Sequence, residues 1–196
     1  MITGTWDKPV FLIGGGPSLK GFKFSRLRGK GVVVAINDAM KSIPWADCVF
    51  TIDTLWLRRR RELLRQFTGE KIAAVPPEYR DVPDFKYADR VNAVRVSRDS
   101  HTIHTGENSG FAAMNLAIVK KGNPIYLLGY DLGEPGHWHD GYEFKTRFDH
   151  TRYSQWVLNF ESVADEIKRS GISVKNCNAD SNIRCFPFMD IGAVVD

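Results

Sequence analysis

The sequence predicts an α/β fold: a single-domain, Rossmann-like sheet that is doubly wound and mostly parallel. Short apolar runs alternate along the chain with segments of helical periodicity, as in proteins built from βαβ units. The runs are apolar at nearly every position, which is typical of strands buried on both faces of a parallel sheet. The chain has the length of one domain, and we expect that domain to span residues 1–196.

The first predicted strand, residues 9–13, leads into a glycine turn. The turn consists of Gly14, Gly15, Gly16, Pro17 and Ser18. Glycine allows a sharp turn and a close approach to a ligand, proline suits a first helical turn, and a helix N-terminus favours phosphate. The turn is neither standard phosphate loop, because the dinucleotide pattern needs glycine at Leu19 and the P-loop needs Lys followed by Ser or Thr. A plain strand-to-helix turn therefore stays open as the alternative.

The next part of the chain repeats the alternation of strands and helices. Residues 31–36, 48–52 and 71–75 read as buried strands, and residues 54–67 as a helix with Leu57, Leu64 and Phe67 on one face. We expect the Arg58–Arg61 run to be a charged helix face rather than a nucleic-acid contact. After that, we expect a surface loop at 76–90, an edge strand at 91–96 and a loop at 97–108.

The second half of the chain closes the pattern. We expect a buried helix at 109–120, a strand at 124–128, an amphipathic helix at 151–170 and a last strand at 172–175. The long connection at about 132–150 is rich in glycine and aromatic residues, which is typical of a lid or binding loop.

Polar residues follow the predicted strands, where open α/β sheets bind their ligands. They are the glycine turn, Asn37, Asp38, Asp53, Tyr130, Asp131 and residues 176–178, with Asn108 and Ser109 at the start of a helix. Small amides and hydroxyls suit a base, a ribose or a phosphate. This convergence predicts a nucleotide site at one edge of the sheet.

Composition adds weaker expectations. The net charge of +4 and the isoelectric point near 9.0 are compatible with an anionic substrate. The three cysteines lack metal-ligand spacing, and the first eight residues are polar, so we expect reduced thiols and a cytoplasmic protein without a signal peptide or membrane span. A homo-oligomer stays open.

Several motifs occur in an order that resembles the bacterial sialyltransferases, which use CMP-activated sialic acid. They are the turn at residues 14–19, Asn37, Ser109-Gly110, YLLGYDL at 126–132, a histidine before the late helix, and NCNADS at 176–181. The turn and Asp53 also resemble a neighbouring group that includes archaeal 6-hydroxymethylpterin diphosphokinase and uncharacterised proteins, some phage-encoded. Both resemblances imply the predicted fold.

The sialyltransferase resemblance implies roles for individual residues. The glycine turn, Asn37, Asn108, Ser109 and Gly110 would hold the nucleotide of a sugar donor, and His150 would act as general base toward a hydroxyl acceptor. Tyr130, or Tyr142 from the long loop, would assist the leaving phosphate, although Leu132-Gly133 stand where the family has an aromatic pair. No cofactor would be required.

Alternatives stay open at several positions. A diphosphokinase-like enzyme would bind ATP and magnesium through Asp53 and Asp131, while Asp53 could instead cap a helix. A third possibility is a binding or assembly protein on the same fold. His150 could be a solvated residue, and the cluster at residues 137–140 suits a lid over a sugar or base better than a metal site, so we predict no metal ligands.

Overall fold

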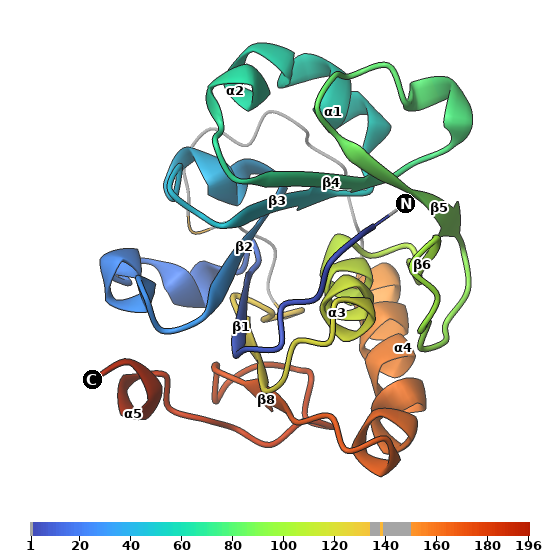
Figure 1. Cartoon of the computed structure of the whole chain (residues 1–196). Helices are drawn as coiled ribbons and strands as arrows, with labels where there is room; N and C mark the ends of the chain where they lie inside the picture. The colour runs from blue at the N-terminus through green and yellow to red at the C-terminus, as the bar shows by residue number, and fades with distance from the viewer. Residues whose placement is uncertain (1, 134–137, 139–149) are drawn as a thin grey trace.

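A computed structural model describes residues 2–133, 138 and 150–196, with only the backbone of His150. Within them, eight strands form one sheet in the order β6-β5-β4-β3-β2-β1-β7-β8, and every pairing is parallel (Figure 1). The strands are β1 (Val10–Ile13), β2 (Val32–Ile36), β3 (Cys48–Thr51), β4 (Glu70–Ala74), β5 (Lys86–Val91), β6 (Thr102–His104), β7 (Ile125–Leu128) and β8 (Val174–Asn176). This confirms the predicted α/β class.

Helices cover both faces of the sheet. The α-helices are α1 (Thr54–Arg59), α2 (Arg61–Gln66), α3 (Ser109–Val119), α4 (His150–Arg169) and α5 (Gly192–Val195). Shorter 3-10 helices are η1 (Pro17–Leu19), η2 (Phe24–Leu27), η3 (Asn37–Lys41) and η4 (Pro77–Tyr79). Helices α3 and α4 share one hydrophobic cluster with one face of the sheet, and α1, α2, η2 and η3 share a second cluster on the other face.

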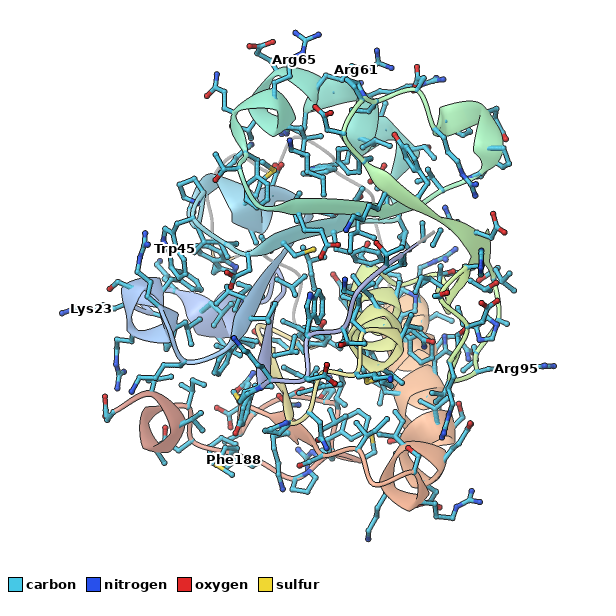
Figure 2. The ribbon with its side chains drawn as sticks, in the orientation of Figure 1. Lys23, Trp45, Arg61, Arg65, Arg95 and Phe188 are labelled. Carbon is cyan, nitrogen blue, oxygen red and sulfur yellow. The ribbon has the colours of Figure 1, made fainter. Side chains whose placement is uncertain are left out.

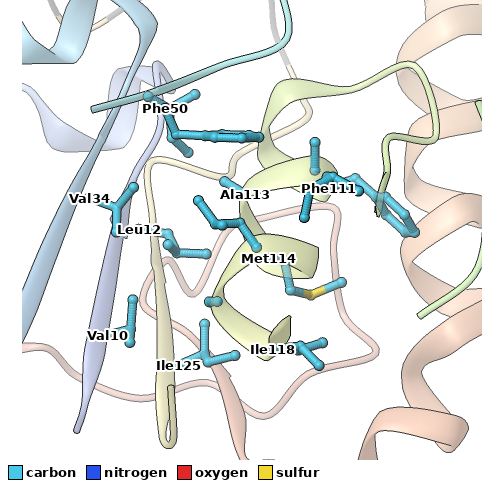
Figure 3. Packing of buried hydrophobic residues seen from close by; sticks show 14 of the residues in the cluster. Val10, Leu12, Val34, Phe50, Phe111, Ala113, Met114, Ile118 and Ile125 are labelled. Carbon is cyan, nitrogen blue, oxygen red and sulfur yellow. The ribbon is translucent and has the colours of Figure 1, made fainter. Parts of the chain in front are cut away.

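Alternate residues of each central strand enter opposite clusters. In β1, Val10 and Leu12 pack on the α3 side, whereas Phe11 and Ile13 pack on the other side (Figure 3). Helix α3 itself is buried almost all round, because the sheet covers one side of it and α4 the other, where the rings of Phe111 and Phe160 lie 5.3 Å apart. This explains the apolar runs: a strand or helix buried on every side has no polar face.

The strand order places a switch point at β1. Strand β1 pairs with β2 on one side and with β7 on the other, so the chain winds outward in one direction from β1 to β6 and in the opposite direction through β7 and β8. In open parallel sheets this is where the loops after two neighbouring strands diverge and leave a crevice. The turns after β1 and β7 therefore border the position at which a ligand is expected.

Three sequence predictions were wrong in detail. The predicted loops at 76–90 and 97–108 contain strand β5 and the edge strand β6, and the strand predicted at 91–96 begins instead at Lys86 and pairs on both sides. Strand β5 has only Ala88 buried and β6 only Ile103, so neither carries an apolar run. Backbone pairing of β5 with β4 and of β6 with β5 forms these strands, and such pairing produces no hydrophobic pattern in the local sequence.

The other difference concerns helix length. Two short helices, α1 and α2, replace the helix predicted at 54–67 and meet at Arg60. The helix expected after the glycine turn is only the three-residue η1, although Pro17 does open it. Of the predicted lid-like loop at about 132–150, residues 134–137 and 139–149 lie outside the described part of the chain.

Two expectations about class can also be compared with the structure. Over the part of the chain that the structure describes, no helix is both long and apolar enough to cross a bilayer. Cys48, Cys177 and Cys185 are free thiols. Burial raises the pKa of Cys177 to about 12 and that of Cys185 to about 11, so both remain protonated near neutral pH.

Candidate functional site

The turns after β1 and β7 are joined by backbone hydrogen bonds. The Gly14 amide donates to the Leu128 carbonyl at 2.8 Å, and the Gly16 amide donates to the Gly129 carbonyl at 2.9 Å. An added Cβ at Gly14 would lie 2.7 Å from the Gly129 carbonyl oxygen, so the end of β7 can pack this closely only if residue 14 is glycine. The ends of these two strands, which the sequence predicted to lie at one edge of the sheet, are therefore in direct contact at the switch point.

Asp131 fills the anion position of the glycine turn. Its carboxylate accepts hydrogen bonds from the Ser18 backbone amide at 2.7 Å, from the Ser18 hydroxyl at 2.5 Å and from the Asn178 amide side chain at 2.9 Å. An added Cβ at Gly16 would lie 2.5 Å from the Asp131 carboxyl carbon. The glycine thus makes room for the protein's own carboxylate, at the place where the sequence predicted a phosphate.

Asn37, the first residue of η3 directly after β2, and Ser109, the first residue of α3, meet at the same edge. The Asn37 side-chain amide donates to the Ser109 hydroxyl at 3.4 Å, and the Thr51 hydroxyl donates to the Asn37 side-chain oxygen at 2.7 Å. Asn37 has a φ of 52°, a left-handed conformation that asparagine tolerates better than most residues. Thr51 was not among the residues predicted for this site, although a single polar residue in an otherwise apolar strand was a usable signal.

A buried ion pair between Asp38 and Arg60 lies next to Asn37 and stabilises this edge. The Asp38 carboxylate is completely buried and receives two hydrogen bonds from Arg60, each 2.9 Å, one from the Trp56 indole at 2.7 Å and one from Lys41 at 2.9 Å. Burial alone would raise the pKa of Asp38, but these donors outweigh it and lower the pKa to about 2. Arg60 was expected on a charged helix face, and its pairing with the buried Asp38 was not predicted.

Two predicted nucleotide-binding residues serve as helix caps. The Asp53 carboxylate accepts from the Trp56 amide at 2.9 Å at the start of α1, and the Asn108 side chain accepts from the Phe111 amide at 2.8 Å at the start of α3. Capping is the alternative that was left open for Asp53. Helix α3 thereby presents its first residue, Ser109, to Asn37.

Tyr130 lies in the core rather than at an open edge. It is 4% exposed, and its hydroxyl donates to the Gly110 carbonyl at 3.1 Å. Burial raises its pKa well above the ordinary value, so the hydroxyl stays protonated. An added Cβ at Gly110 would lie 2.8 Å from the Tyr130 ring. Tyr130 therefore fixes the start of α3 against the end of β7.

Trp138, from the long connection, packs on the outside of the glycine turn. Its indole N–H donates to the Gly14 carbonyl at 2.8 Å and its backbone amide donates to the Gly15 carbonyl at 3.2 Å. Its ring lies 4.8 Å from that of Phe24. Trp138 belongs to the cluster at residues 137–140 that was expected to form a lid over a sugar or base, and its contact with the glycine turn was not expected from the sequence.

The remaining predicted residues are only partly described. His150 is the first residue of α4, one residue before the predicted start of that helix, and its side chain lies outside the description, as does the whole of Tyr142. Within the described ranges, no group of three or more His, Cys, Asp or Glu side chains is arranged to hold a metal ion. Asp53 and Asp131, the carboxylates named for magnesium, both accept hydrogen bonds from backbone amides.

Comparison with known proteins supports the fold. No protein-family model matches the chain, and no curated protein sequence matches it. Among solved structures, the chain is similar to the sialyltransferase CstII from Campylobacter jejuni, solved in complex with the substrate analogue CMP-3FNeuAc. The identity is 15%, the TM-score is 0.53, and the match covers 93% of this chain and 86% of that one. At this identity the similarity shows a shared Rossmann-like α/β fold.

Proposed function

We propose that this protein is a glycosyltransferase-like enzyme that transfers a sugar from a CMP-type donor to a hydroxyl acceptor. The observation that carries the proposal is the contact between Asn37 and Ser109 beside the β1–β7 switch point. These are the residues to which the sialyltransferase resemblance assigns the nucleotide. The similar fold of CstII, whose structure holds a CMP-linked substrate analogue, supports the same reading.

The internal carboxylate constrains how the donor would bind. A phosphate beside the Ser18 amide would meet the Asp131 carboxylate, and two anions at that distance repel each other. We therefore assign the ribose and base to Asn37 and Ser109, and the phosphate to the side of the turn away from Ser18. In this arrangement Asp131 is a positioning residue, because it holds the turn without touching the donor.

The proposed reaction is a direct displacement at the anomeric carbon. His150, as a neutral imidazole, takes the proton of the acceptor hydroxyl while the hydroxyl oxygen forms the new glycosidic bond. The bond between the anomeric carbon and the phosphate oxygen breaks, and CMP leaves with the electron pair. Tyr142 stabilises that leaving phosphate by hydrogen bonding, while Tyr130 maintains the position of Gly110.

Binding and turnover can be tested separately. CMP without metal should raise the melting temperature, and the wild-type protein should release CMP from CMP-sialic acid with water as acceptor. His150→Ala should abolish this release while retaining the CMP shift. Asn37→Ala and Asn37→Gly should both weaken CMP binding by about tenfold, because each removes the side-chain amide. Only alanine strains the left-handed backbone at this position, so an equal loss in the two variants is due to the amide and not to strain.

Other outcomes would reject the proposal. Stabilisation by ATP only in the presence of magnesium would favour the diphosphokinase-like alternative. No response to any nucleotide would favour a binding protein on the same fold. Full activity of His150→Ala would remove the general-base assignment but would leave the nucleotide site intact.

A further inference from the structure

A recess lies at the opposite edge of the sheet from the candidate site, where β1, β2 and β3 begin. It has a volume of about 430 Å³, which is within the range of small-molecule sites. Lys8, Arg28, Lys30, Trp45 and Asp47 line it. Each of these residues precedes a strand whose carboxyl end lies at the candidate nucleotide site, so the length of the strands separates the two places.

The recess carries an excess of positive charge. Lys8, Arg28 and Lys30 are exposed, and no ion pair is found for any of them among the residues that the structure describes. The lining carboxylate, Asp47, accepts a hydrogen bond from the Val33 amide at 2.8 Å, which engages one of its oxygens with the backbone. Three cations thus share one wall with a single, partly engaged carboxylate.

Some other arginines of this chain have carboxylate partners, whereas Arg28 has no ion pair among the residues that the structure describes. Arg60 pairs with the buried Asp38, and Arg61 and Arg65 pair with Asp81 and Glu62. Unpaired like charges that lie around one hollow repel each other, and a bound anion relieves that repulsion.

Trp45 gives the recess a rigid wall. Its ring is half-buried against the second hydrophobic cluster, and the Arg28 guanidinium lies 4.1 Å from the ring centroid. This cation–π contact holds one of the three cations in place without neutralising it, so its N–H groups remain charged donors. The site is therefore partly organised before any ligand binds.

From this geometry we infer a second binding site, for a small polyanion that carries at least two phosphate or carboxylate groups. A volume of about 430 Å³ and three cations suit such a ligand. Arg28 forms bidentate contacts to one anionic group, and Lys8 and Lys30 bind the other as point charges. The site is independent of the proposed transferase function, because it shares no lining residue with the nucleotide edge.

The test uses calorimetric titration with pyrophosphate and with citrate, which separates phosphate from carboxylate ligands. Arg28→Gln and Lys30→Gln should each weaken binding by about tenfold or more. Arg95→Gln is the matched control, since Arg95 is also exposed and lies on the other side of the molecule from Trp45 (Figure 2). It removes the same charge and should leave the affinity unchanged.

Two further measurements locate the ligand. Binding should change the tryptophan fluorescence of the wild-type protein, and Trp45→Phe should remove that change while retaining an aromatic wall. Asn37→Gly, which keeps the left-handed backbone unstrained, should bind pyrophosphate normally, which distinguishes this site from the nucleotide edge. Failure of both anions to bind, an equal loss in Arg28→Gln and Arg95→Gln, or loss of binding in Asn37→Gly would overturn the inference.

Discussion

The two edges of one parallel sheet differ in how their polar side chains are satisfied. At the carboxyl edge, Asn37, Asp38 and Asp131 are hydrogen-bonded to neighbouring parts of the same chain. At the amino edge, Arg28 and Lys30 border a hollow, and the structure gives neither an ion-pair partner within the described residues. The polar groups named at the carboxyl edge thus bind one another, whereas Arg28 and Lys30 at the amino edge are available to bind an anionic ligand.

This difference shows that stability and ligand binding draw on different residues. A buried polar group that has its partners becomes costly to disturb, since removing one partner leaves the other desolvated and unpaired. An exposed cation without an ionic partner stays hydrated and contributes little to folding. The comparison therefore predicts that substitutions at the carboxyl edge lower the free energy of unfolding far more than similar substitutions at the amino edge.

The largest expected effect is that of Arg60→Ala. Asp38 would keep its buried charge but lose its bidentate partner, and the free energy of unfolding should fall by about 3–5 kcal/mol. Arg28→Ala is the matched change at the amino edge and should cost at most about 1 kcal/mol, the value of an exposed cation–π contact. Urea denaturation measures both. Equal losses would mean that the two edges do not differ in the way described.

Acid should act on the carboxyl edge through Asp38. The pKa of this residue is about 2 in the folded protein against an ordinary value of 3.8, so as the pH falls the unfolded chain takes up the proton first. The stabilisation is complete above about pH 4 and is lost as the pH falls through 3.8 toward 2, a change of about 2 kcal/mol. Denaturation of wild type and Asp38→Asn across pH 2–5 measures it, because only the wild type has this titration. Parallel pH profiles would contradict the role of the pair.

A smaller effect is expected at the glycine turn. The Cβ of Gly16→Ala would push the Asp131 carboxylate away from Ser18 and should cost about 1–2 kcal/mol, since the obstructing atoms are the end of a side chain that can shift. Gly133→Ala is the control, because its Cβ would have no neighbour closer than 3.5 Å and should be nearly neutral. Thermal melts measure both. A neutral Gly16→Ala would show that the contact with Asp131 does not hold the turn.

Much of the fold could be predicted because its central elements are buried on both sides. Strands β1, β2, β3, β4 and β7 and helix α3 follow the predicted ranges within two residues at either end. Strands β5 and β6, the two outermost strands on one side of the sheet, could not be predicted in this way, because each has only one buried residue. Hydrophobic periodicity arises from burial, and a strand with a single buried residue shows almost none.

The candidate site could be predicted in place but not in detail. The sequence located the polar strand ends, and the structure brings Asn37 to Ser109 and Asp131 to Ser18. The sequence could not indicate that Asp131 occupies the anion position of the turn, since Asp131 and Ser18 lie 113 positions apart. Nor could it separate Asp53 as a ligand from Asp53 as a cap, because both roles need a carboxylate at the same point.

The sequence alone therefore determined the class of the fold, the buried strands and the edge at which polar groups collect, because each of these follows from local apolar patterns and from the rules of parallel sheets. Only the tertiary structure decided which polar groups satisfy one another and which remain free. The Asp38–Arg60 pair, the carboxylate in the glycine turn and the basic recess beside Trp45 all depend on residues distant in the chain. Such contacts are set by packing, which no short stretch of sequence encodes.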